Sequence, residues 1–467
     1  MLFNSYAFWL FLALVWGVYR LLPHRGQNIL LLLASYYFYS CWDWRFLPLI
    51  FTTTLVNYFT ALGIERSNDK KKHYWLMLTS ATVSLGILGL FKYWGFFVES
   101  TTDMLTWLGF HANISTLSII LPVGISFYTF QTLSYTIDVY RGKTKATRSL
   151  PDFALYVAYF PQLVAGPIER SSSLLPQITH PRPKHTGNFS EGLYLILIGL
   201  FLKVVVGDNL GFIADGIFSA QKHEITGTDA LVGVYCFAFQ IYGDFAGYSS
   251  IARGVSKWLN IDLMTNFRMP YLARNPSDFW QRWHISLSSW LRDYLYIPMG
   301  GNQCSTIKIY RNLMLTMLLG GLWHGAGWTF IIWGGIHGLI LCIYRALPHS
   351  VKLPGFWGRV LATVWFFHVV CFTWLFFRAD NLAQAWDILT LIFTHQEMTY
   401  LSRYGLGMLA FFCAPLMIYE IWLEQKHTLR RLEVVHWGWR AATYCYLVSM
   451  LILFPPQVFG QFIYFQF

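Results

Sequence analysis

The stretch NLMLTMLLGGLWHGAGWTFIIWGGIHGLILCIY, residues 312–344, contains no Asp, Glu, Lys or Arg but carries His324 and His337. A helix crosses a bilayer with about 20 apolar residues, so this stretch is longer than one perpendicular helix needs. It therefore predicts membrane-embedded helix on both sides of His324. An ionisable side chain at such depth is costly if charged, and it usually marks a substrate or proton path.

Uncharged stretches of this kind recur along the chain. They cover residues 1–19, 26–42, 46–64, 74–91, 104–137, 360–377 and 441–467, and weaker apolar segments lie near 153–168, 192–206, 230–248 and 404–423. Only 12% of the residues are charged, whereas a soluble domain has about 25%. The runs are continuous rather than alternating, so they predict an all-α polytopic membrane protein with roughly eleven to thirteen passes or partial passes.

The net charge of +11 is typical of basic cytoplasmic loops and does not indicate a nucleic-acid partner. Arg20 and Arg25 follow the first run, and basic residues at 66 and 70–72 follow the third. Placing both groups inside puts the N-terminus outside and leaves Asp43-Trp44-Arg45 as a tight outer turn. The seven cysteines are scattered and predict neither a disulfide framework nor a zinc site.

His324 lies among glycines, which let another backbone or a thin ligand approach its imidazole. A neutral core imidazole is an equally good interpretation of His324 from this stretch alone, and it is the better one for His337. A metal site needs three or more ligands, and no such spacing is present. An imidazole titrates near neutral pH, so the chemistry that remains is proton transfer to and from a small reacting pair.

A second polar segment precedes this one. Residues 277–288 predict a helix that opens just after Pro276, with Asp278 and Arg282 four residues apart on one face and His284 one turn before Ser288. Trp283 is among its tryptophans, and Arg292, Asp293 and Tyr294 continue its polar character. An internal ion-pair network of Arg282, Arg292 and Asp293 is favoured over a direct catalytic role for these three side chains.

Several segments together resemble the membrane-bound O-acyltransferases, and within them the bacterial alginate O-acetylase branch. They are LPVGISFYTF (121–130), IDVYRG (137–142), AGPI (165–168), DFAGYS (244–249), Asn266-Phe267, RWHISLS (282–288), WLRDYLYIP (290–298) and LGGLWHG (319–325). The resemblance implies one membrane domain over 1–467, with N-terminal helices (1–110), a catalytic core (111–345) and C-terminal helices (346–467). The helices would form a ring around a transmembrane tunnel.

The resemblance also implies roles for individual residues. His324 matches the family's catalytic histidine, and His284 matches a second, supporting histidine that would orient the donor or stabilise an oxyanion. Candidates for the tunnel are Arg282, Trp283, Ser288, Arg292, Asp293, Tyr294, Trp323, His337, Asp244 and Tyr248. No tightly bound cofactor or metal is implied. The donor would be acetyl-CoA or a thioester derived from it, and an acyl-histidine intermediate stays open.

The implied function is transfer of an acetyl group from the cytoplasm across the bacterial inner membrane to an exported polysaccharide. An extracytoplasmic acetyltransferase partner would deliver it to the glycan. Gln281 and Ser250 depart from the branch pattern, so alginate leads but peptidoglycan or another surface glycan stays open. A membrane transporter is the alternative from another class, and a structural scaffold is the third.

Overall fold

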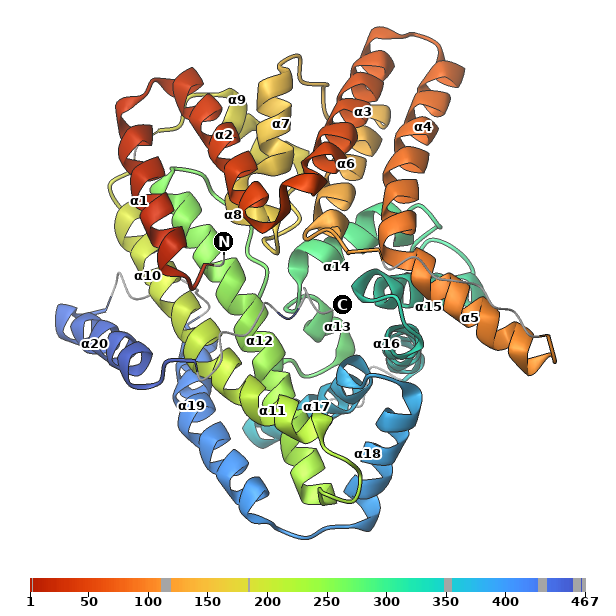
Figure 1. Cartoon of the computed structure of the whole chain (residues 1–467), viewed down its shortest axis with the longest axis vertical. Coiled ribbons are helices and arrows are strands. Elements are labelled where there is room, and N and C mark those ends of the chain that lie inside the picture. The colour runs from red at the N-terminus through yellow and green to blue at the C-terminus, as the bar shows by residue number, and fades with distance from the viewer. Residues whose placement is uncertain are drawn as a thin grey trace. The chain divides into compact units, whose positions relative to one another are not determined.

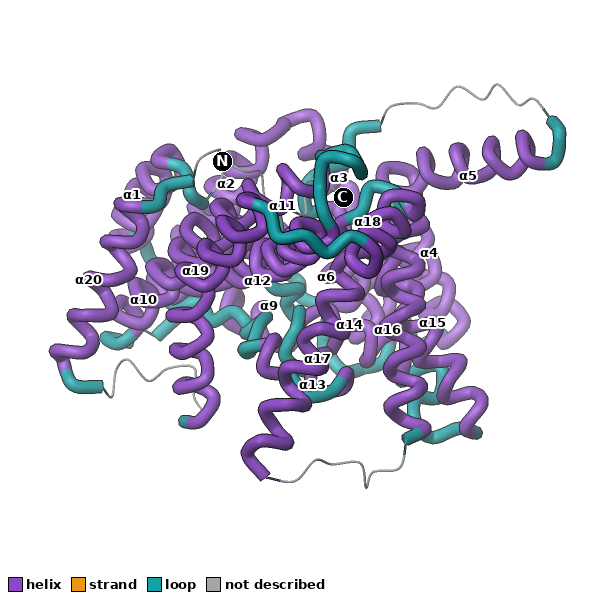
Figure 2. Tube along the Cα trace, turned by 90° about the horizontal axis from the view of Figure 1, so that it is seen from below, coloured by secondary structure: helices purple, strands orange, loops and turns teal. Residues whose placement is uncertain are grey.

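The computed structural model describes residues 1, 3–110, 119–183, 185–347, 355–426, 435–456 and 463. Within these ranges the chain forms helices joined by loops and has no strand (Figure 2). The all-α prediction is confirmed. The chain divides into two compact units, one made of Met1–Gly192 with Ala252–Met264 and the other of Leu193–Ile251 with Thr265–Phe467. The predicted single domain with its three segments stays a prediction.

The first unit contains the N-terminal helices. They are α1 (Tyr6–Leu21), α2 (His24–Asp43), η1 (Trp44–Phe46), α3 (Leu47–Arg66), α4 (Lys70–Leu88), η2 (Gly89–Tyr93), α5 (Trp94–Trp107), α6 (Ile125–Tyr140), α7 (Leu150–Ala158), α8 (Phe160–Leu163) and α9 (Ser171–Thr179). The predicted turn between α2 and α3 is present, with Arg45 and Asp43 forming an ion pair of 2.6 Å. Its side of the membrane stays a prediction.

Two predicted apolar segments of this unit are broken up in the structure. The described part of the run 104–137 is not continuous helix, because Gly124 has a φ of +76° immediately before α6 begins. A Cβ on Gly124 would lie 2.4 Å from the Leu163 carbonyl oxygen, so only glycine fits this approach. The segment near 153–168 is two short helices, because the chain turns at Tyr159 and Pro161 lies in the first turn of α8.

Two long helices have residues in both units, namely α10 (Asn188–Leu200) and α12 (Gly227–Trp258). The rest of the second unit consists of η3 (Phe201–Asp208), α11 (Asn209–Ser219), η4 (Pro270–Leu272), α13 (Pro276–Trp280), α14 (Ile285–Leu291), η5 (Arg292–Tyr296), α15 (Thr306–His324), α16 (Trp328–Ala346), α17 (Gly355–Arg378), α18 (Leu382–Thr394), α19 (Tyr400–Gln425) and α20 (Trp437–Leu453).

Seven stretches of helix in the described ranges are long and apolar enough to cross a membrane. They are His24–Arg66, Lys70–Trp107, Asn188–Ser219, Gly227–Trp258, Trp328–Ala346, Gly355–Arg378 and Tyr400–Gln425, and α1 and α18 are shorter apolar helices. Several of these stretches contain more than one helix, and the predicted number of passes stays a prediction. The short helices α13 and α14 are not among the spans, although they carry much of the candidate site.

Candidate active site

His324 is the last residue of α15, where the chain turns back into α16. Glycine is a poor helix former, and Gly325 and Gly327 flank the break. The two helices lie side by side (Figure 1). They approach so closely that a Cβ on Gly321 would lie 2.2 Å from the Phe330 carbonyl oxygen. The glycines therefore hold this histidine at the tip of a tight helical hairpin.

The imidazole of His324 is buried among aromatic rings. Only 3% of the residue is exposed. The ring centroid of Trp333 lies 5.1 Å away, that of Phe377 5.4 Å and that of Trp323 5.0 Å, all at steep interplanar angles. His284 completes the enclosure with its ring centroid 6.1 Å from that of His324. The structure thus brings together the two histidines that the resemblance pairs.

His284 does not lie within a continuous helix over 277–288, and that part of the sequence prediction is wrong. The helix opens after Pro276 as predicted, but α13 ends at Trp280 and α14 begins at Ile285. His284 lies at the start of α14 with φ 43° and ψ 54°, a left-handed conformation that is rare for a residue with a Cβ. Such backbone strain is found preferentially at functional sites.

The side chain of His284 is fully buried. The ring of Phe245 from α12 meets it edge-on at 4.7 Å, and Trp323 packs against it at 5.7 Å. Burial disfavours the charged imidazolium and lowers the pKa of His284 from 6.5 to about 3. His284 is therefore neutral at physiological pH.

Asn266 joins the His284 turn to α12. Its backbone carbonyl accepts a hydrogen bond from Ile285 N at 2.9 Å. Its side-chain Oδ1 lies 3.2 Å from His284 Nδ1 and accepts from Ser286 N and Ser286 Oγ at 3.2 and 3.0 Å. Its Nδ2 donates to Ser249 Oγ at 3.3 Å. Asn266 is buried and contacts the candidate site directly, a role that sequence reasoning missed although Asn266-Phe267 is one of the matching segments.

Arg282 holds the same turn from the other side. Its Nε donates to Asp278 at 2.6 Å, which confirms the predicted pair, and its Nη2 donates to Glu424 on α19 at 2.8 Å. The predicted network does not extend to Arg292 and Asp293, which pair with each other at 2.8 Å. Arg292 is 62% exposed there, because η5 carries it away from Arg282.

A second carboxylate on α19 also reaches this region. Glu420 lies one helical turn before Glu424 and accepts a hydrogen bond from Tyr242 of α12. Glu420 is 4% exposed. Sequence reasoning missed both acids, although carboxylates four residues apart in an apolar helix were a usable signal of an internal polar contact.

His337 is close to the candidate site but packs in an aromatic cluster of its own. It is 1% exposed and contacts the rings of Trp333, Trp280 and Phe279 at 4.8, 5.0 and 6.0 Å. Trp333 lies between His337 and His324 and contacts both rings. This surrounding favours the interpretation of His337 as a core imidazole that supports the site.

The two predicted tryptophans differ in position. Trp323 contacts both His284 and His324. Trp283 is fully buried behind His284, where it packs on Trp374 at 4.9 Å and stacks on Phe279 at 5.7 Å. Trp323 therefore contacts the histidine pair directly, whereas Trp283 packs on Trp374 and Phe279 and not on His324.

Asp244 belongs to a buried ionic cluster beside the site. Lys203, in the π-helix η3, contacts Asp244 at 2.6 Å and Asp208 at 2.8 Å, and Ile463 N donates to Asp244 at 2.6 Å. The following residue, Phe245, packs on His284. Tyr248 is buried one turn further along α12. The cluster therefore fixes α12 where Phe245 packs on His284.

Of the remaining candidates, Ser288 and Arg292 lie along a cavity of about 380 Å³ next to the His284 turn, whereas Asp293 and Tyr294 are not among its lining residues. Ser288 and Arg292 line it together with Ser277, Trp280, Gln281, Ile285, Ser289, Leu291, Tyr296, Leu313, Thr316, Met317 and Leu341. Ser288 Oγ also donates to the Trp283 carbonyl at 3.1 Å. Tyr294 packs on Trp290 at 5.0 Å. Through Trp280 and Ile285 the cavity adjoins the segments that carry both His284 and His337.

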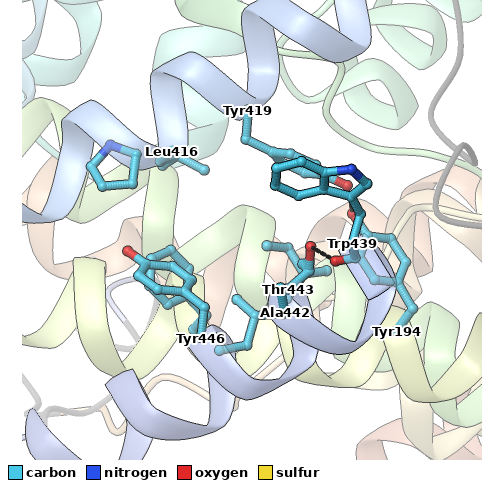
Figure 3. Close-up of a pocket in the computed structure, with 11 residues that line it drawn as sticks. Tyr194, Leu416, Tyr419, Trp439, Ala442, Thr443 and Tyr446 are labelled. Carbon is cyan, nitrogen blue, oxygen red and sulfur yellow. Dashed lines mark hydrogen bonds between the residues drawn. The ribbon is translucent and has the colours of Figure 1, made fainter. Parts of the chain in front are cut away.

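A second cavity, of about 300 Å³, lies between α10, α19 and α20 and is lined mainly by aromatic and aliphatic side chains (Figure 3). The hydroxyls of Tyr194 and Tyr419, which line it, are 2.5 Å apart. None of its lining residues belongs to the two histidine motifs. In the described part of the chain no three His, Cys, Asp or Glu side chains come together as a metal site would require.

The family model of the membrane-bound O-acyltransferases matches residues 145–386. A probable alginate O-acetylase of Azotobacter vinelandii is 46% identical over 402 residues, 85% of this chain and 79% of the relative. That of Pseudomonas aeruginosa is 45% identical over 400 residues, 84% of this chain and 75% of the relative. A peptidoglycan O-acetyltransferase of Helicobacter pylori is 38% identical over 423 residues, 83% of this chain and 79% of the relative.

The chain therefore belongs to the membrane-bound O-acyltransferase family. It is a multi-pass membrane enzyme that transfers an acyl group, and its relatives include proteins named for acetyl transfer to alginate and to peptidoglycan. The resemblance found in the sequence is confirmed, and the transporter and scaffold interpretations are set aside.

Proposed function

We propose that this enzyme moves an acetyl group from a cytoplasmic thioester donor across the membrane for O-acetylation of an exported polysaccharide. The observation that carries the proposal is the enclosed pair of His324 and His284, whose rings lie 6.1 Å apart between the tip of the α15–α16 hairpin and the strained turn before α14. Both lie in segments of the family motif, and both side chains are buried.

His324 is the general base of the proposed reaction. It takes the proton from an acceptor hydroxyl, whose oxygen then attacks the thioester carbonyl carbon. A C–O bond forms, the C–S bond breaks, and the imidazolium of His324 returns its proton to the leaving thiolate. The imidazole is thus regenerated as neutral base, and no further reactant is required.

The aromatic enclosure supports a small acyl group. Trp323, Trp333 and Phe377 pack around His324 and exclude water from its ring. Water at this position would hydrolyse the thioester, so exclusion protects the donor. The bulk of these three rings favours a short acyl group such as acetyl over a long chain.

The donor we propose is acetyl-CoA or a thioester made from it, taken up on the cytoplasmic side of the bacterial inner membrane. We also propose that an extracytoplasmic acetyltransferase partner delivers the acetyl group to the polysaccharide, because the described residues form helices, many of them long and apolar enough to cross a membrane, joined by short loops.

Alginate is the first proposed acceptor, since the relatives at 46% and 45% identity are named for it. Peptidoglycan is the second, from the relative at 38% identity. Expression in an alginate-producing strain that lacks its own O-acetylase membrane subunit separates them. Restored acetyl ester in purified alginate supports the first; unacetylated alginate with added acetyl ester in peptidoglycan overturns it.

The matched control for this strain is the His368→Ala variant. His368 lies on α17 with an exposed ring that bonds the Val364 carbonyl, far from the histidine motifs in sequence. It should restore acetylation as the unchanged protein does, whereas His324→Ala at equal membrane level should not. Acetylation of neither glycan by the unchanged protein, with its partner present, would contradict the proposed function.

A further inference from the structure

Asn266 contacts the His284 turn through both its backbone carbonyl and its side-chain oxygen. Its backbone carbonyl holds Ile285 N, and its side-chain oxygen faces Ser286 N, Ser286 Oγ and His284 Nδ1. Arg268 N, two residues on, donates to the Arg282 carbonyl at 2.9 Å. The 266–268 segment is therefore bonded to both sides of His284.

The orientation of the Asn266 amide follows from one obligate donor. A backbone N–H can only donate, and Ser286 N lies 3.2 Å from Oδ1. Exchanging the amide oxygen and nitrogen would place Nδ2 against that N–H, with two donors facing each other. The other end of the amide agrees, since Nδ2 then donates to Ser249 Oγ at 3.3 Å.

The amide in turn fixes the position of a proton on His284. Asn266 Oδ1 can only accept, so its 3.2 Å contact with His284 Nδ1 is a hydrogen bond when Nδ1 carries the ring hydrogen; Ser286 Oγ lies 3.4 Å from the same nitrogen. The imidazole is neutral because burial lowers its pKa to about 3. A neutral imidazole has a single ring proton, so Nε2 carries a lone pair and acts only as an acceptor.

We propose that Asn266 is a positioning residue that locks His284 in its Nδ1–H tautomer, so that His284 meets the reactants with a hydrogen-bond acceptor. This inference rests on the proposed function of the histidine pair. An acceptor at Nε2 orients a reactant that carries an N–H or O–H, such as the acceptor hydroxyl, a role that differs from the donor orientation and the oxyanion stabilisation implied by the resemblance. Donation from Nε2 to a developing oxyanion would require the other tautomer.

The first test reads the tautomer itself and needs no activity. ¹⁵N NMR of the purified, histidine-labelled protein is compared with that of His284→Gln, and the difference isolates the His284 nitrogens. We expect a protonated Nδ1 and an unprotonated Nε2 from pH 6 to 8. A protonated Nε2 in the unchanged protein would overturn the inference.

The second test uses two substitutions of Asn266 and their pH profiles. Asn266→Asp keeps every accepted hydrogen bond but adds negative charge, which raises the pKa of His284 and moves the acidic limb of kcat towards neutral pH. Asn266→Leu removes the lock, and kcat falls about ten- to a hundredfold with KM for the donor unchanged. If Asn266 only stabilised the fold, the acidic limb of the kcat–pH profile of Asn266→Asp would lie at the same pH as in the unchanged enzyme. That result contradicts the proposal.

The two proposals fail in different ways. Full acetyl transfer by His324→Ala, together with the Nδ1–H tautomer in the ¹⁵N spectrum, would refute the proposed role of His324 as the base. It would leave the positioning role of Asn266 supported. If His324→Ala abolished transfer while His284 showed a protonated Nε2, the lock would fall alone. Should Asn266→Leu not fold, the Asp variant and the spectrum of the unchanged protein still decide the question.

Discussion

The imidazole rings of His284 and His324 lie with their centroids 6.1 Å apart and at an angle of 65°. His324 is the last residue of α15, and His284 immediately precedes α14. The relative position of the two rings therefore depends on contacts between two separate helix ends. Trp323 touches both rings and sets their separation.

The close approach of α15 and α16 depends on Gly321. An added Cβ would lie 2.2 Å from the Phe330 carbonyl oxygen, a backbone atom that cannot move alone. We expect Gly321→Ala to lower the free energy of unfolding by about 1–3 kcal/mol and to reduce activity. Gly335→Ala is the control, since its Cβ would meet only Leu318 Cδ2 at 3.4 Å. Equal thermal unfolding midpoints for both variants in detergent would refute the packing argument.

Arg282 acts through a fork that binds two carboxylates. Lysine keeps the charge but cannot hold Asp278 and Glu424 together in that geometry. Arg282→Lys should therefore cost about 1–2 kcal/mol of stability and lower kcat about tenfold through the His284 turn. Arg378→Lys is the matched change, because the partner carboxylates Asp215 and Asp380 are 50% and 72% exposed. Arg378→Lys should therefore have a smaller effect on Tm and on kcat than Arg282→Lys.

The depressed pKa of His284 makes stability depend on pH. The pKa is about 3 in the folded protein because of burial, against an ordinary 6.5. Below pH 6.5 the imidazole of His284 takes up a proton in the unfolded chain but stays neutral in the folded protein. The contribution of His284 to the free energy of unfolding is therefore complete above pH 6.5 and is lost as the pH falls towards 3. The loss is about 2 kcal/mol at pH 5.

This pH dependence is measured as the change in Tm between pH 7 and pH 5. His284→Gln has no such proton to take up, so its Tm should fall less over this interval than that of the unchanged protein. His368→Ala, which removes an exposed ring, should keep the full dependence. An identical slope in His284→Gln and the unchanged protein would show that His284 is not held neutral.

The membrane class could be predicted from the sequence because apolar run lengths are a local signal of burial in lipid. The glycine-flanked His324 in an uncharged stretch left a functional and a core imidazole equally open, and its pairing with His284 came from the resemblance. Asp278 and Arg282 were paired correctly because a four-residue separation on a helix brings their side chains together.

The rest of the candidate site could not be read from the sequence. Glu424 and Asn266 reach the His284 turn from α19 and from the loop after α12, and nothing in the local pattern of either residue specifies that partner. The positive φ of His284 was missed because a bulky residue seldom adopts it, so residues 277–288 matched a helix better than a turn. Tertiary contacts override helix propensity at this position.

The central claim is that His324 is the base of acetyl transfer, and its most direct measurement is a transfer rate. Purified protein in lipid nanodiscs, with labelled acetyl-CoA and its extracytoplasmic partner, is compared with His324→Ala and His368→Ala at equal folded amount. We predict a fall of about 10³-fold in kcat for His324→Ala and an unchanged rate and Tm for His368→Ala. The Tm of His324→Ala should fall, because the substitution removes a buried ring from a packed aromatic cluster. A His324→Ala protein that folds and transfers acetyl at the rate of the unchanged enzyme would contradict the account.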